Sequence, residues 1–121
     1  MEGIMKAYKV YQQDLMGYEG DIVYCKNYNK AIEVFNSVVK KAIADVAGDI
    51  VDKADFGDEI ASFREWNKDV EIISRKYPYL LYRKKGLLTA QVFYWERASY
   101  EYQEYDIVNS IAILEEIEII E

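Results

Sequence analysis

The sequence predicts an α+β fold in which an antiparallel sheet of four to five strands carries two helices on one face. Three observations predict it. Apolar and polar residues alternate near both ends of the chain, as in strands. Between them, residues 29–47 repeat apolar side chains at steps of three and four, as in an amphipathic helix. The only proline, Pro78, separates a second helical stretch from a tyrosine-rich stretch of strand-forming residues.

The composition predicts a soluble protein with one domain over residues 1–121, of which residues 1–4 are a frayed leader. The chain has 121 residues, of which 51% are apolar and 31% charged. The net charge of −7 argues against direct binding to nucleic acid, which needs excess positive charge. Cys25 is the single cysteine, so no internal disulfide forms. Neither a signal peptide nor a membrane-length apolar run is visible, and we therefore expect the cytoplasm of a bacterial cell.

The first third of the chain predicts a hairpin followed by a helix. Residues 4–12 alternate and indicate a strand, residues 14–21 contain two glycines and indicate a turn, and residues 21–27 indicate a second strand. The helix over residues 29–47 has Asn29 as its predicted N-cap and ends before Gly48.

The middle of the chain predicts an acidic connector over residues 49–59 and a second helix over residues 58–76. Asp58 caps this helix in the prediction, and Pro78 prevents its continuation.

The last part of the chain predicts three strands. Residues 79–82 form a short strand and residues 83–86 a turn. Residues 87–99 fit a strand or a helix, and the run of β-forming residues at 92–95 favours the strand. Residues 110–120 indicate a final strand at the edge of the sheet, where its glutamates discourage pairing with another sheet.

Several chemistries are excluded by missing residue types, and we therefore expect a protein that is not an enzyme and needs no cofactor or metal. The chain has no histidine, so it has neither a Ser-His-Asp nor a Cys-His arrangement. It also has no glycine-rich phosphate loop. The acidic connector is interpreted as an exposed loop with helix caps, and cation binding by its carboxylates stays open.

Aromatic and acidic residues near the C-terminal end form the first candidate site, a surface for a protein partner. Tyrosine and tryptophan supply large contact areas at low entropic cost and are enriched at interface hot spots. The alternative is that these side chains form the sheet and cover its core. The predicted residues are Tyr94, Trp95, Tyr100, Glu101, Tyr102, Glu104 and Tyr105.

A basic cluster beside two tyrosines forms the second candidate site, a pocket for a nucleotide or another anion. An aromatic face can stack a base while cations hold a phosphate. The alternative is a solvated turn in an acidic molecule. The predicted residues are Tyr79, Tyr82, Arg83, Lys84 and Lys85.

Short stretches at both ends give the chain a resemblance to a known group of proteins. The stretches are Met5–Tyr11, Gly17–Asp21, Asn29–Ala31 and Glu115–Glu118. Residues 5–35 and 111–121, about a third of the chain, are similar to small phage and mobile-element proteins of the anti-defence type, which include anti-CRISPR inhibitors.

The resemblance implies a non-enzymatic, phage-encoded inhibitor whose partner is a defence effector or nuclease of the bacterial host. A protein that sequesters a nucleotide signal and a toxin-immunity protein are the alternatives. The same tyrosine-rich surface would also suit a homo-oligomer.

Overall fold

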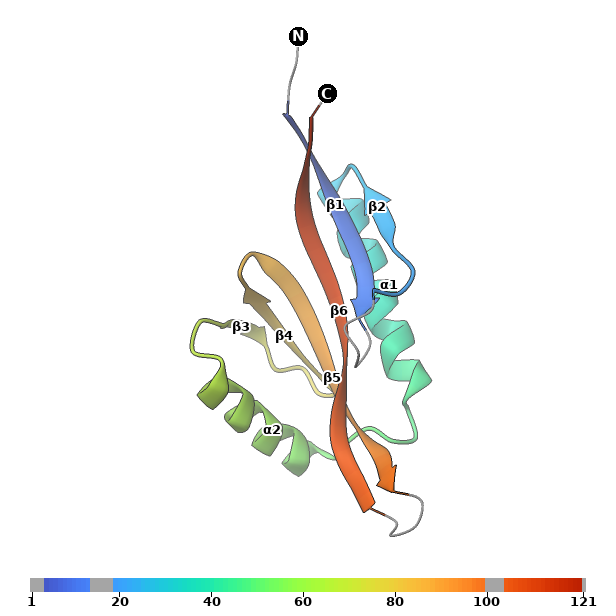
Figure 1. Cartoon of the computed structure of the whole chain (residues 1–121), viewed down its shortest axis with the longest axis vertical. Helices are drawn as coiled ribbons and strands as arrows, with labels where there is room; N and C mark the ends of the chain where they lie inside the picture. Colours follow the sequence, from blue (N-terminus) through green and yellow to red (C-terminus); the bar gives the residue numbers. More distant parts are fainter. Residues whose placement is uncertain (1–3, 14–18, 100–103, 121) are drawn as a thin grey trace.

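The computed structural model describes residues 4–13, 19–99 and 104–120 and contains six strands and two helices in these ranges (Figure 1). In chain order the elements are β1 Ile4–Gln13, β2 Val23–Cys25, α1 Tyr28–Asp45, α2 Lys53–Trp66, β3 Glu71–Ser74, β4 Tyr79–Lys84, β5 Leu87–Ser99 and β6 Glu104–Ile120. No helix in these ranges is both long and apolar enough to span a membrane.

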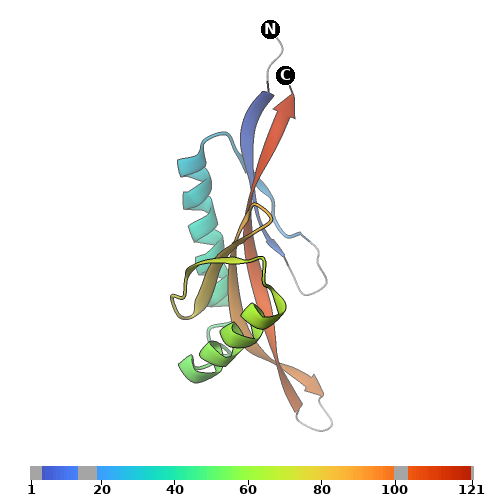
Figure 2. The ribbon, with the colours of Figure 1, turned by 90° about the vertical axis from the view of Figure 1, so that its left-hand side faces the viewer.

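The six strands form one antiparallel sheet in the order β2-β1-β6-β5-β4-β3. Strand β6, with 17 residues, runs along the whole length of the molecule (Figures 1 and 2). It pairs with β1 along its C-terminal half and with β5 along its N-terminal half. The α+β class predicted from the sequence is thereby confirmed, with six strands in place of four to five.

The two helices lie against opposite faces of the sheet, which corrects the prediction of a single covered face. On β5, Ala90 packs in a core that includes α1, whereas Phe93 packs in a core that includes α2. On β6, Ala112 likewise packs in the core that includes α1, and Ile107 packs against the core that includes α2. Successive residues of a strand point to opposite faces, so even and odd positions of β5 and β6 define an α1 face and an α2 face.

Helix α1 forms because its apolar residues recur on one stripe that the sheet buries. Asn27, rather than the predicted Asn29, is the N-cap, and its side chain accepts a hydrogen bond from the Lys30 backbone N–H at 3.2 Å. The buried stripe consists of Ala31, Phe35, Val39 and Ala42. These residues pack on β1, β5 and β6, chiefly against Val10, Ala90, Ala112 and Leu114.

Helix α2 begins and ends earlier than the sequence predicted, at residues 53–66 instead of 58–76. Asp52 caps it, because its carboxylate accepts a hydrogen bond from the Asp55 backbone N–H at 2.8 Å. The segment 71–74, predicted as helix, is strand β3, and its Ile72 pairs with Tyr82 of β4. Isoleucine is compatible with the spacing of a helix and with that of a strand. The segment forms a strand because it pairs with the edge of β4.

The last two strands resolve the remaining expectations. Residues 87–99 are a strand, as the β-forming run favoured. Strand β6 starts at Glu104, before the predicted 110, and lies in the middle of the sheet rather than at its edge. Its end beyond Leu114 pairs with β1 alone, and its start before Ile111 pairs with β5 alone, so each end leaves one side without a partner among the described strands.

Candidate partner-binding surface

Strands β5 and β6 continue beyond the rest of the sheet as a two-stranded arm, which we define as residues 93–99 and 104–109. The pairing of β4 ends where Tyr79 meets Val92, and that of β1 ends where Gln13 meets Ile111. Past these points β5 and β6 pair with each other, and the arm projects at the lower end of the molecule (Figures 1 and 2).

The α2 face of the arm carries the exposed aromatic residues. Trp95 lies opposite Ile107, and Arg97 lies opposite Tyr105, so the four side chains share one face. Trp95 keeps 37% of its surface exposed and Tyr105 keeps 55%. Two large aromatic side chains therefore remain accessible on a backbone that strand pairing holds in place.

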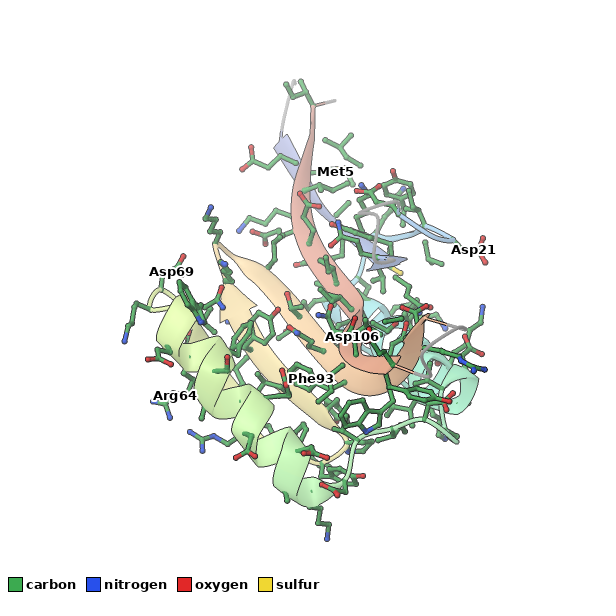
Figure 3. The ribbon with its side chains drawn as sticks, turned by 60° about the horizontal axis from the view of Figure 1, so that its bottom comes forward. Met5, Asp21, Arg64, Asp69, Phe93 and Asp106 are labelled. Atoms are coloured by element: carbon green, nitrogen blue, oxygen red, sulfur yellow. The ribbon has the colours of Figure 1, made fainter. Side chains whose placement is uncertain are left out.

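The connector between the helices fixes the base of the arm. Its residues 49–51 run along the outer side of β5, where the Trp95 backbone N–H donates to the Asp49 carbonyl at 2.8 Å. The Val51 N–H donates to the Phe93 carbonyl at 3.2 Å, and Ile50 forms a bridge with Tyr94. Val51 is fully buried, and Phe93 lies between the sheet and α2 (Figure 3). Part of the predicted acidic connector thus anchors the arm to the core.

The α1 face of the arm carries acidic residues. Glu96 lies directly opposite Asp106, and both residues are exposed. Like charges directly across a strand pair repel each other. Glu104, two positions from Asp106, is also exposed. On the same face Tyr94 is half-buried, and its burial, with the nearby Glu96 carboxylate adding to it, raises the pKa of its phenol.

Of the seven residues predicted for the partner surface, the structure brings together four on the arm. Trp95 and Tyr105 share one face, Tyr94 lies on the other, and Glu104 pairs with Ser99. The remaining three, Tyr100, Glu101 and Tyr102, lie outside the described residues.

The five residues predicted for the nucleotide pocket are not brought together. Tyr82 is buried, with 5% exposed, and its hydroxyl donates to the Gln91 amide oxygen at 2.9 Å. Burial raises the pKa of this phenol to about 12. The Lys84 ammonium donates to the Asn67 side-chain oxygen at 2.7 Å. Both side chains therefore serve the packing of the α2 face.

The other three members of that set point elsewhere. Arg83 lines a pocket of about 310 Å³ together with Tyr8 and Tyr28, whose rings meet edge to face at 5.4 Å. Lys85 is exposed in the turn between β4 and β5. Tyr79 packs on the α1 side and lines a different cleft. Alternation along β4 separates Tyr79 and Tyr82, because three positions place them on opposite faces.

Sequence reasoning missed Glu96 and Asp106 as a facing pair. Their pairing depends on the register of the β5–β6 hairpin, which shifts at a bulge between Arg97 and Ser99. The alternation of acidic and aromatic residues at positions 104–106 indicates a strand with its acidic side chains on one face. It does not indicate which residue of β5 lies opposite Asp106, because that depends on the register.

The acidic connector shows no metal-binding arrangement in the parts of the chain that the structure describes. Within residues 4–13, 19–99 and 104–120, no three acidic or cysteine side chains gather closely enough to hold an ion. Asp52 acts as a helix cap instead. Partial burial, and then the charge of Asp52, raise the pKa of Asp55.

The fold and this surface together define an acidic α+β protein with a projecting aromatic arm. In comparisons with known proteins, the chain matches no family model, no curated protein and no solved structure.

Proposed function

We propose that this protein is a non-catalytic inhibitor that inserts its β5–β6 arm into a basic groove of a larger bacterial protein, such as a nuclease or another defence effector. One observation carries the proposal. The arm combines exposed Trp95 and Tyr105 on one face with the repelling pair Glu96 and Asp106 on the other.

The two faces suit different parts of such a groove. Proteins that bind nucleic acid line their grooves with lysine and arginine, which hold phosphates. Glu96 and Asp106 would meet these cations, and a positive partner would remove the repulsion between the two carboxylates. Trp95 and Tyr105 would supply the desolvated anchors that dominate binding energy in protein interfaces. A toxin-immunity protein would work by the same physics, and the identity of the partner distinguishes the two.

The first experiment locates the contact. A photo-crosslinking residue placed at Tyr105 should capture a protein from the bacterial lysate, whereas the same residue placed at Trp66, a site 84% exposed on α2, should not. The captured protein is then purified, and its affinity for the wild-type chain and for variants is measured by calorimetry.

Aromatic and charge variants test the two faces separately. Trp95→Ala should weaken binding by roughly tenfold or more, and the matched control Trp66→Ala should leave it unchanged. Asp106→Lys should also weaken binding, whereas Glu118→Lys, at the opposite end of β6, should not. A nuclease or effector inhibited equally well by Trp95→Ala and Asp106→Lys would contradict the proposal, and a captured toxin would identify immunity as the function.

A further inference from the structure

We infer a second binding site, independent of the arm, in a cleft between α1 and the turn that joins β3 to β4. The geometry points to a small phosphorylated molecule with a flat ring, of the nucleoside monophosphate class. The cleft has a volume of about 400 Å³, within the range of small-molecule sites. Its lining residues are Asn36, Ser37, Val39, Lys40, Ile43, Lys76 and Tyr79.

The charge of the cleft selects an anion. Lys40 comes from α1 and Lys76 from the β3–β4 turn, so two separate elements each contribute a lysine to the lining of the cleft. No carboxylate lines the cleft. Neither lysine forms an ion pair with any residue that the structure describes. Together, in a protein whose net charge is −7, the two lysines form a positively charged site that a phosphate dianion would neutralise.

Polar side chains beside the lysines add to this preference. The Asn36 amide makes no hydrogen bond within the described residues, so its N–H groups are available to a phosphate oxygen. The Ser37 hydroxyl donates to the Glu33 carbonyl at 3.1 Å, which leaves its oxygen able to accept from a ligand hydroxyl such as that of a ribose.

An aromatic and aliphatic wall provides the place for the ring. Tyr79 is half-buried and packs against the α1 core together with Ile43, so its ring is held in position. The Tyr79 backbone N–H donates to the Lys76 carbonyl at 3.0 Å, which keeps the aromatic ring and the ammonium group on one turn. Val39 continues the apolar wall on α1. Stacking on such a surface tolerates different bases, so we expect binding of purine and pyrimidine nucleotides alike.

The test is calorimetric titration of the whole chain with AMP, CMP, adenosine and inorganic phosphate. Both nucleotides should bind in a saturable way, and adenosine and inorganic phosphate should each bind at least about tenfold more weakly than AMP. The double variant Lys40→Ala with Lys76→Ala should lose AMP binding by about tenfold or more. Lys41→Ala, which removes an exposed lysine of α1 that does not line the cleft, should bind AMP as the wild type does.

Three results would overturn the inference. The first is no saturable binding of either nucleotide at millimolar concentration. The second is an unchanged AMP affinity in the double lysine variant, whose folding circular dichroism would verify. The third is inorganic phosphate binding as tightly as AMP, since the Tyr79 wall would then contribute nothing. Because the arm and the cleft share no residue, Trp95→Ala should leave AMP binding intact and serves as a further control.

Discussion

Glu96 of β5 and Asp106 of β6 face each other directly across the arm, and both carboxylates are exposed to solvent. This arrangement opposes the stability of the free protein, because like charges across a strand pair repel. Removing one charge should therefore stabilise the fold. We expect Glu96→Gln to raise the midpoint of thermal unfolding by roughly 1–2 °C at low salt.

Salt and a matched variant make that prediction specific. The gain from Glu96→Gln should shrink at high ionic strength, because salt screens exposed charges. Glu116 lies on β6, the strand of Asp106, and forms an ion pair with Lys6 of β1. Glu116→Gln removes this ion pair and should therefore give no such gain in unfolding temperature. If both variants raise the unfolding temperature equally, the effect comes from the overall net charge and not from the facing pair.

The buried hydrogen bond between Tyr82 and Gln91 yields a second prediction. Tyr82→Phe removes the one donor that the Gln91 amide oxygen has among the described residues, and it leaves that oxygen buried without a partner there. We expect a loss of about 1–2 kcal/mol in the free energy of unfolding, measured in urea. Adding Gln91→Met should restore part of the loss, because both polar groups are then gone. Tyr105→Phe, at an exposed site, should change stability little.

The same phenol predicts a loss of stability at alkaline pH. Burial raises the pKa of Tyr82 from 10.0 to about 12, so the folded state favours the neutral phenol. This contribution is fully present below pH 10 and is lost as the pH rises through about 12, because the unfolded chain ionises first. The free energy of unfolding should fall by roughly 2–3 kcal/mol over that interval.

Comparison with Tyr82→Phe isolates this phenol from the other groups that titrate at high pH. The variant should lose less stability than the wild type between pH 10 and 12, so the two curves should converge. Parallel curves would show that Tyr82 does not carry the dependence.

The sequence alone was sufficient to predict those elements whose residue pattern favours one type of secondary structure. Helix α1 follows the spacing of Phe35 and its neighbours, and residues 87–99 follow their β-forming composition. The sequence was insufficient where the same residue pattern fits both a helix and a strand. Ile73 fits a helical stripe as well as a strand, and only the open edge of β4 selects β3.

The candidate sites were harder to predict because they depend on which face each side chain takes. Tyr79 and Tyr82 look equivalent in the sequence, yet one lines a cleft beside α1 and the other is buried under α2. Lys40 of α1 lines the same cleft as Tyr79 because α1 packs on the sheet. Such partners come from distant segments, and the composition of neither segment indicates them.

The cap at the start of α2 gives the last prediction, which separates a hydrogen bond from a charge. The Asp52 carboxylate accepts from the Asp55 N–H at 2.8 Å, and its charge contributes, after burial, to the raised pKa of Asp55. Asp52→Ala should therefore cost about 1 kcal/mol in the free energy of unfolding. Asp52→Asn keeps an oxygen acceptor but removes the charge, so it should retain the stability while the pKa of Asp55, followed by NMR, moves down toward its ordinary value. If Asp52→Asn is as unstable as Asp52→Ala, the carboxylate stabilises α2 through the helix dipole rather than through the cap.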